Sequence, residues 1–310
     1  MSKHALVTGG SGFLGGYMVS ALQNAGYTVT NLGRTANPKA DINLAADITM
    51  PITLPDQTYS LVVHAAGKAH VVPKTEEEVQ QFYAVNREGT RNLLQALQAP
   101  RLPEALVLIS TVAVYGAEKG KEIAETAPIK AQDPYGLSKI AAEELAQAWS
   151  IEHRIPATIL RLPLVVGHDA PGNLGAMVKG MKKGRYFNIA GGDALRSMVL
   201  AHDVAHALLD AAKFPGVYNL TDGEHPSFAQ LAKVISEVRQ YGQAKNLPGV
   251  VAGGIGLAGT ALEKITKKRM PFSWRTFQKM THTLTFSDAQ ARKTWGWEPQ
   301  KVLRHPEFWL

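Results

Sequence analysis

The sequence predicts an α/β protein, a doubly wound parallel sheet with a smaller, discontinuous C-terminal lobe that binds substrate. Three observations predict it. Apolar runs of strand length alternate with longer helical patterns through the first half of the chain. The first of these runs leads directly into a glycine-rich loop, from Thr8 to Gly15. After Arg161 the alternation breaks, and Gly and Pro become frequent before a basic cluster at Lys179 to Arg185.

The elements follow in order from the apolar and β-branched runs and from the amphipathic stretches between them. Strands are expected at Ala5–Thr8, Thr28–Leu32, Ile42–Leu44, Leu61–His64, Ala105–Ser110, Ala157–Leu162 and Val217–Leu220. Helices are expected at Gly12–Ala25, Glu76–Gln98, Tyr135–His153, Val204–Lys213 and Phe228–Gln240. We expect residues 1–165, with 196–220 returning to them, to form a Rossmann-like domain. The substrate-binding lobe would comprise residues 166–195 and 221–310.

Composition excludes several classes of protein. The chain has 310 residues, a formal net charge of +7 and no cysteine, so disulfides and thiolate metal sites are impossible. We expect no metal site. We also expect a cytoplasmic location, since Lys3 and His4 lead into a short strand and not into a signal peptide. The basic residues accompany no nucleic-acid-binding motif, so nucleic acid is not the expected partner. They form either a solvated basic face or a surface that attracts an anionic substrate, a phosphate-bearing cofactor or a lipid headgroup.

One apolar stretch, from Leu247 to Leu262, is interrupted by Pro248 and five glycines. It falls short of the roughly 18 continuous apolar residues of a spanning helix. We interpret it as a loop plus a helix, with peripheral contact to a membrane surface as one alternative.

The glycine loop after the first strand predicts a dinucleotide site. Glycines at this spacing permit a tight turn, close approach of the backbone to pyrophosphate, and close packing of helix on strand. The helix that opens within the loop presents free N–H groups to the phosphates. From this loop we expect the cofactor to contact Gly9, Gly12, Phe13, Leu14 and Gly15.

The end of the second strand bears on the choice of cofactor. An NAD site usually carries a carboxylate here, which holds the ribose 2′-hydroxyl. This chain has Gly33 followed by Arg34. Without the carboxylate a 2′-phosphate is not repelled, and Arg34 can pair with it, so NADP is favoured over NAD. The alternative is that Arg34 merely stacks on adenine.

Two further segments are expected at the same pocket. Asp47, beside Ile48, can accept a hydrogen bond from the adenine amino group. Small residues at 65–67 allow the backbone to lie against the cofactor, namely Ala65, Ala66 and Gly67. We interpret the preceding His64 as a packed histidine and not as a catalyst.

A candidate catalytic set stands in the middle of the chain. Tyr135 and Lys139 are four residues apart on an expected helix and so share one face. An ammonium beside a phenol stabilises phenolate and lowers the Tyr pKa, which suits proton exchange with a carbonyl or an alcohol. Lys139 can also hydrogen-bond the nicotinamide ribose. Thr111 follows a strand at the sheet edge where such folds bind ligands, and its hydroxyl would hydrogen-bond the reacting oxygen.

Together these residues resemble the extended short-chain dehydrogenase/reductase family, also called the NAD-dependent epimerase/dehydratase family. The matching pieces are Thr8–Gly15, His64–Ala66, Val85-Asn86 with Gly89-Thr90, Thr111–Gly116, Tyr135–Lys139, Arg196 to Val204, and Leu284–Asp288 with Gly296, Trp297 and Pro299. The resemblance implies a cofactor at the carboxyl edge of the sheet and Tyr135 as the acid/base. It makes Asn86 a structural tie between the central helix and the active-site strand. It assigns Arg196 to the substrate, because Arg196 matches a position that often grips a sugar diphosphate; the alternative is a surface salt bridge. We also expect Asn173 to bind the substrate.

Departures from the family pattern narrow the reaction. Dehydratases of the family carry an Asp-Glu pair just after the catalytic Thr, whereas Val112 and Ala113 stand here, so dehydration is not expected. Hexose 4-epimerases often have an Asn in the stretch that matches Arg161 to Leu164, and this chain has none there. Their late arginine-rich substrate motif is not evident either.

We therefore predict an NADPH-dependent reductase of a nucleotide-linked 4-keto sugar. The alternative is a nucleotide-sugar 4-epimerase that retains its cofactor. A third hypothesis is a steroid- or flavonoid-like alcohol dehydrogenase, with which Pro163 and the apolar Val250–Leu262 stretch are compatible. A non-catalytic scaffold is disfavoured because both Tyr135 and Lys139 are present. The long helices at 76–98 and 135–153 predict a homodimer through a two-fold helical bundle.

Overall fold

The computed structural model describes residues 3–69, 71–266 and 270–310. At its centre lies a seven-stranded parallel sheet in the order β11-β7-β5-β4-β1-β2-β3. Its strands are β1 (Lys3–Thr8), β2 (Tyr27–Gly33), β3 (Ile42–Ala45), β4 (Leu61–His64), β5 (Leu106–Thr111), β7 (Ala157–Leu162) and β11 (Gly216–Asn219). All seven expected strands are confirmed. The strand order reverses between β1 and β4, and ligands bind in the crevice at such a point.

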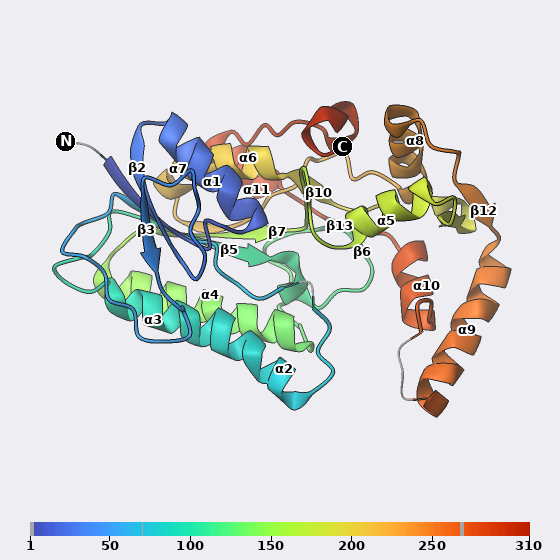
Figure 1. The fold of residues 1–310 in the computed structure, drawn as a ribbon, viewed down its shortest axis with the longest axis horizontal. Helices are drawn as coiled ribbons and strands as arrows, with labels where there is room; N and C mark the ends of the chain where they lie inside the picture. Colours follow the sequence, from blue (N-terminus) through green and yellow to red (C-terminus); the bar gives the residue numbers. More distant parts are fainter. Residues whose placement is uncertain (1–2, 70, 267–269) are drawn as a thin grey trace.

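Helices cover both faces of the sheet, which confirms the doubly wound fold (Figure 1). On one face lie α1 (Phe13–Asn24), α6 (Ala201–His206), α7 (Leu208–Lys213) and α11 (Ala289–Trp295). On the other lie α2 (Glu76–Phe82), the π-helical turn η1 (Tyr83–Glu88), α3 (Gly89–Ala96) and α4 (Pro134–His153). The helix expected at Val204–Lys213 is instead two consecutive helices that begin at Ala201.

The central strands are apolar throughout because both of their faces are buried. In β1, Ala5 and Val7 join the core under α1 and α6, while Leu6 joins the core under α3 and α4. Alternate side chains thus point to opposite layers, as the pleat of a strand requires. The continuous apolar runs of the sequence have this physical cause.

Beyond β7 the regular alternation of strand and helix ends, and part of this region forms a third core, which includes Val166, Met181, Leu231 and Trp309. The elements of this part are β8 (Leu164–Val166), α5 (Asn173–Lys182), β9 (Phe187–Ile189), η3 (Ala190–Gly192), β10 (Met198–Leu200), α8 (Phe228–Arg239), β12 (Lys245–Leu247), α9 (Gly249–Thr266), α10 (Trp274–Thr281), β13 (Leu284–Phe286), η4 (Val302–Arg304) and η5 (Pro306–Phe308). Trp297 packs under the main sheet, so the C-terminal segment contributes to two cores.

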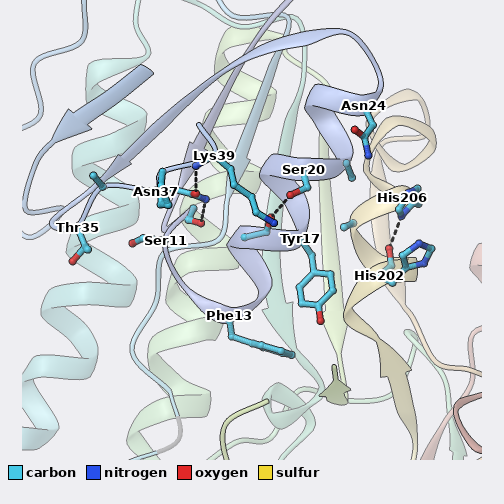
Figure 2. Close-up of a pocket in the computed structure, with 16 residues that line it drawn as sticks. Ser11, Phe13, Tyr17, Ser20, Asn24, Thr35, Asn37, Lys39, His202 and His206 are labelled. Atoms are coloured by element: carbon cyan, nitrogen blue, oxygen red, sulfur yellow. Dashed lines mark hydrogen bonds between the residues drawn. The ribbon is translucent and has the colours of Figure 1, made fainter. Parts of the chain in front are cut away.

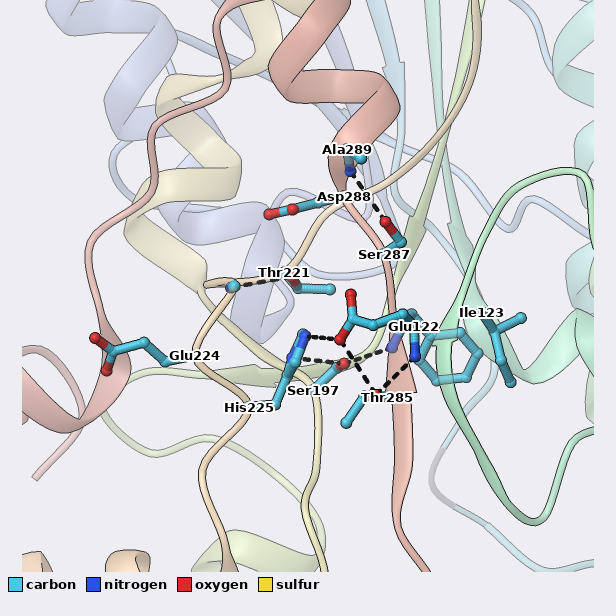
Figure 3. A network of polar contacts seen from close by, with 12 residues as sticks. Glu122, Ile123, Ser197, Thr221, Glu224, His225, Thr285, Ser287, Asp288 and Ala289 are labelled. Atoms are coloured by element: carbon cyan, nitrogen blue, oxygen red, sulfur yellow. Dashed lines mark hydrogen bonds and ion pairs between the residues drawn. The ribbon is translucent and has the colours of Figure 1, made fainter.

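A polar network with buried Ser197, His225 and Thr285 and the exposed Glu122 joins segments that are far apart in the chain (Figure 3). Nε2 of His225 lies 2.7 Å from a carboxylate oxygen of Glu122, and Nδ1 of His225 lies 3.0 Å from the Ser197 hydroxyl. Ser197 Oγ also accepts the main-chain N–H of Phe286 at 2.8 Å, and Thr285 Oγ1 accepts that of Glu122 at 2.9 Å. These bonds fasten β6 (Gly120–Ile123), which pairs with β13, to His225 and to Ser197, the residue before β10.

Candidate active site

The glycine loop between β1 and α1 is built for close backbone approach. Gly9 has φ +72°, and a Cβ there would lie 2.8 Å from Cα of Ala66. A Cβ on Gly15 would overlap the Gly9 carbonyl oxygen. Gly12 is the N-cap of α1 and makes no side-chain hydrogen bond. The first N–H groups of the helix, near Phe13 and Leu14, are therefore free to bind an anion. The loop therefore fits the pyrophosphate of a dinucleotide.

The expected adenosine end of the site lies at the carboxyl ends of β2 and β3. Gly33 ends β2, and Arg34 follows it as an exposed cation. The carboxylate of Asp47 accepts hydrogen bonds from Thr49, at 2.9 Å from N and 2.8 Å from Oγ1. These bonds lower the pKa of Asp47, and the positive charge of Arg34 adds to the effect. Ile48 beside it is buried. Of the residues predicted to contact the cofactor at this end, Arg34 is therefore the one that can reach a phosphate.

His64 ends β4 as a buried neutral link. Its Nδ1 lies 2.7 Å from Thr8 Oγ1 and its Nε2 lies 2.8 Å from Thr90 Oγ1. Thr8 Oγ1 in turn accepts the main-chain N–H of Ala66 at 3.1 Å. Burial lowers the pKa of His64 to about 3, helped by the nearby Lys139 ammonium. His64 therefore positions the chain at Ala65 and Ala66 without carrying charge.

Three predicted catalytic side chains meet at the carboxyl end of β5. Thr111 is the last residue of β5, and its hydroxyl hydrogen-bonds the phenol of Tyr135 on α4. One turn further along α4, Lys139 donates from Nζ to the carbonyl oxygen of Ile109 at 2.6 Å. A Cβ on Gly67 would lie 3.9 Å from that Nζ. The segment after β4 and the Tyr–Lys helix thus face one another across the crevice of the sheet.

The expected lowering of the Tyr135 pKa is wrong for the protein alone. Burial raises the pKa of the phenol above its usual value, and the hydrogen bond from Thr111 opposes this rise only in part. Lys139 is itself buried, its ammonium is turned toward Ile109, and burial lowers its pKa to about 8. Desolvation therefore decides the direction of the shift, and the attraction to Lys139 that the four-residue spacing led us to expect does not contribute to it.

Asn86 holds the two sides of the crevice together. Its Oδ1 accepts the N–H of Lys68 at 2.7 Å, and its Nδ2 donates to Ser138 Oγ at 2.9 Å. Ser138 is the neighbour of Lys139 on α4. Asn86 lies in the π-helical turn Tyr83–Glu88, and such turns often occur at functional sites. The structural tie implied for Asn86 thus has a geometric basis.

A buried charged network under Lys139 escaped the sequence analysis. Arg161 Nη2 lies 2.7 Å from Glu143, and both side chains are only 4% exposed. Arg161 Nη1 donates to the Tyr115 hydroxyl at 3.0 Å, and Ser110 Oγ donates to Glu143. Two signals could have revealed it: Glu143 lies four residues after Lys139, and Arg161 is a cation inside an apolar strand, where a charge needs a partner.

Of the two residues predicted to bind substrate, the structure describes the side chain of Arg196 but not that of Asn173. The guanidinium of Arg196 donates to the main-chain carbonyls of Leu195, His282 and Lys279, and it lies 5.3 Å from the Phe228 ring centroid. Burial lowers its pKa to about 10. Arg196 thereby fastens the end of α10, and several of its donors are already engaged. Asn173 begins α5, and its side chain lies outside the described part of the chain.

An open pocket of ≈ 650 Å³ adjoins the glycine loop on the α1 side (Figure 2). It is lined by Ser11 and Phe13 of the loop, by Thr35 and Lys39 after β2, and by His202 and His206 of α6. None of the three predicted catalytic residues lines it. The pocket therefore adjoins the phosphate-binding side of the nucleotide site and lies away from the reacting centre.

Residues 5–221 match the model of the NAD-dependent epimerase/dehydratase family. The chain belongs to this family. It is an NAD(P)-dependent enzyme of the extended short-chain dehydrogenase/reductase type, as the glycine loop and the Tyr–Lys pair predicted.

Several relatives are named sugar-nucleotide enzymes. UDP-glucose 4-epimerase of Azospirillum brasilense is 33% identical over 184 residues, which are 56% of this chain and 52% of the relative. GDP-6-deoxy-D-mannose reductase of Pseudomonas aeruginosa is 28% identical, over 77% of this chain and 81% of the relative. N-acetyl-alpha-D-glucosaminyl-diphospho-ditrans,octacis-undecaprenol 4-epimerase of Escherichia coli O157:H7 is 27% identical, over 92% and 88%.

Solved structures share the whole fold. RMD from Pseudomonas aeruginosa, complexed with NADPH, has a TM-score of 0.71 at 23% identity, and covers 98% of this chain and 96% of its own. MoeE5 with UDP-glucose and NAD has a TM-score of 0.72 at 21% identity, over 97% and 95%. Neighbours of this fold thus carry either nicotinamide cofactor, which leaves the choice between NAD and NADP to the residues of this chain.

Among the helices that the structure describes, none is both long and apolar enough to span a membrane.

Proposed function

We propose that the protein reduces the keto group of a nucleotide-linked 4-keto sugar, with NADPH as reductant. Tyr135 would give its proton to the ketone oxygen while Thr111, already hydrogen-bonded to the phenol, holds that oxygen in place. The Lys139 ammonium would stabilise the phenolate that remains. The bound nicotinamide would supply the reducing equivalents. The cofactor would lie along Gly9 to Gly15, which form the cradle described above.

The observation that carries the choice of a reductase is the exposed cation Arg34 at the end of β2, where an NAD enzyme usually places a carboxylate. Arg34 can pair with the 2′-phosphate of NADPH. Thr35 and Lys39 line the adjacent pocket together with Ser11, and so offer a hydroxyl and an ammonium on the same side of the loop. NADPH is the usual exchangeable reductant, which fits net reduction better than a retained cofactor.

The second candidate is a 4-epimerase, favoured by relatives that are named 4-epimerases. In either reaction the sugar would lie between Tyr135 and the lobe that we propose for residues 166–195 and 221–310. The Escherichia coli relative is named for a lipid-linked diphosphate sugar, so such a sugar is a further candidate substrate of this chain. We further propose a homodimer through α2, α3 and α4.

Mass spectrometry of the nucleotide that co-purifies with the protein tests the cofactor. Consumption of NADPH with a nucleotide 4-keto-6-deoxy sugar then tests the reaction. Replacing the catalytic acid in Tyr135→Phe should lower kcat by roughly a hundredfold or more, whereas Tyr241→Phe in the C-terminal lobe should not. Tightly held NAD with interconversion of 4-epimers and no net cofactor turnover would establish the epimerase instead. Full activity of Tyr135→Phe would refute both.

A further inference from the structure

Helix α9 packs on the molecule with its smallest residues inward. Ala252, Gly253, Gly256 and Gly259 are buried against the segment that begins α10. A Cβ on Gly256 would lie 3.3 Å from the Cβ of Phe277, and one on Gly259 would overlap a main-chain carbonyl oxygen. A surface helix of a globular protein normally turns its large apolar residues toward the core. In α9 only glycine and alanine fit there.

The large apolar side chains of α9 face outward instead. Their exposed fractions are 91% for Val250, 50% for Val251, 48% for Ile255, 58% for Leu257, 47% for Leu262 and 77% for Ile265. At 100° per residue they project from the side opposite the glycines. Isolated exposed apolar residues are common, but a continuous face of them marks an interaction site. Figure 1 shows α9 at the far end of the molecule, away from the sheet.

The outward face of α9 carries no acidic residue and has a cation and an indole at its edge. Lys264 is exposed in the last turn of α9. Trp274, at the start of the neighbouring α10, lies against Gly253 and is partly exposed. Glu263 is the only acidic residue in the sequence of α9, and it is half-buried. A cation and an indole at the edge of an apolar helix face are typical of helices that lie in a membrane interface.

We propose that the outward face of α9 docks the protein onto an anionic lipid bilayer. The helix would lie in the plane of the headgroups with its apolar side chains in the boundary of the acyl chains. Lys264 would contact anionic headgroups, and the net charge of +7 would favour the same surface. A second copy of the chain supplies no negative charge from this face, so it complements the site less well.

Flotation with lipid vesicles tests the proposal without any catalytic readout. The whole protein should float with vesicles of equal parts phosphatidylcholine and phosphatidylglycerol, more weakly with phosphatidylcholine alone, and more weakly at high salt. The double variant Ile255→Glu/Leu262→Glu should reduce binding roughly tenfold or more, because it places two charges in the apolar boundary. The matched control is Met50→Glu, whose side chain is exposed in the turn after β3, and it should bind like the wild type.

A second variant guards against a folding defect in the first. Lys264→Glu should weaken binding to the anionic vesicles while it keeps the circular dichroism of the wild type. Failure of the wild type to float with anionic vesicles would overturn the proposal, and so would equal flotation of Ile255→Glu/Leu262→Glu. A wild-type dimer that this double variant converts to monomer in the absence of lipid would show that the face binds a second copy instead.

Discussion

Removing one charge from the network beneath Lys139 should destabilise the protein measurably. Arg161 Nη2 lies 2.7 Å from Glu143, its Nε lies 3.1 and 3.3 Å from the two carboxylate oxygens, and both side chains are almost inaccessible to water. Glu143→Gln keeps the shape of the side chain but leaves the Arg161 cation buried without its counter-charge. Breaking a buried pair in this way typically costs about 3–5 kcal/mol.

The thermal consequence follows from the size of the chain. At about 2.1 cal/mol/K per residue, a chain of 310 residues unfolds with an entropy of about 0.65 kcal/mol/K. The loss from Glu143→Gln therefore corresponds to a fall in Tm of about 5–8 °C. Thermal unfolding followed by circular dichroism measures it. Glu144→Gln is the matched control, because Glu144 is the next residue on α4 and is exposed; its Tm should be close to that of the wild type.

The same substitution should also move the pH profile. The charge of Glu143 raises the pKa of Lys139, against the burial that brings it down to about 8. Without that charge the pKa falls further, so the ammonium is lost at a lower pH. The alkaline decline of activity should then begin at lower pH in Glu143→Gln than in Glu144→Gln. Identical Tm values and identical pH profiles for the two variants would refute the reasoning.

Three further substitutions test the nucleotide site and the catalytic hydroxyl. Gly15→Ala should weaken cofactor binding roughly tenfold or more in a fluorescence titration, because its Cβ would overlap the loop backbone, whereas Gly16→Ala, with open space around it, should bind like the wild type. Arg34→Ala should raise the KM for NADPH roughly tenfold, because a charge-assisted hydrogen bond is lost, and it should leave the KM for NADH unchanged. Equal effects on both KM values would contradict a contact with the 2′-phosphate. Thr111→Val should lower kcat about 10- to 100-fold with little change in Tm, and an unaltered kcat would remove Thr111 from the mechanism.

Much of the site was accessible from sequence because its parts are local. A glycine loop directly after a strand, and a Tyr and Lys four residues apart on a helix, each lie within one turn or one element. Parallel strands bring their carboxyl ends to one edge, so the order of strands alone placed Thr111 near Tyr135. The pKa of Tyr135 was not accessible in this way, since it depends on how much protein covers the phenol.

Sequence by itself determined the class of fold and the seven strands of the main sheet, and it predicted the dinucleotide loop and the Tyr–Lys pair, because periodicity and local spacing carry that information. Tertiary structure alone decided that Arg161 pairs with Glu143 and that Arg196 holds the end of α10. It also decided that α9 turns glycine inward and its large apolar residues to solvent. These features depend on which neighbour covers each side chain, and the neighbours come from distant parts of the chain.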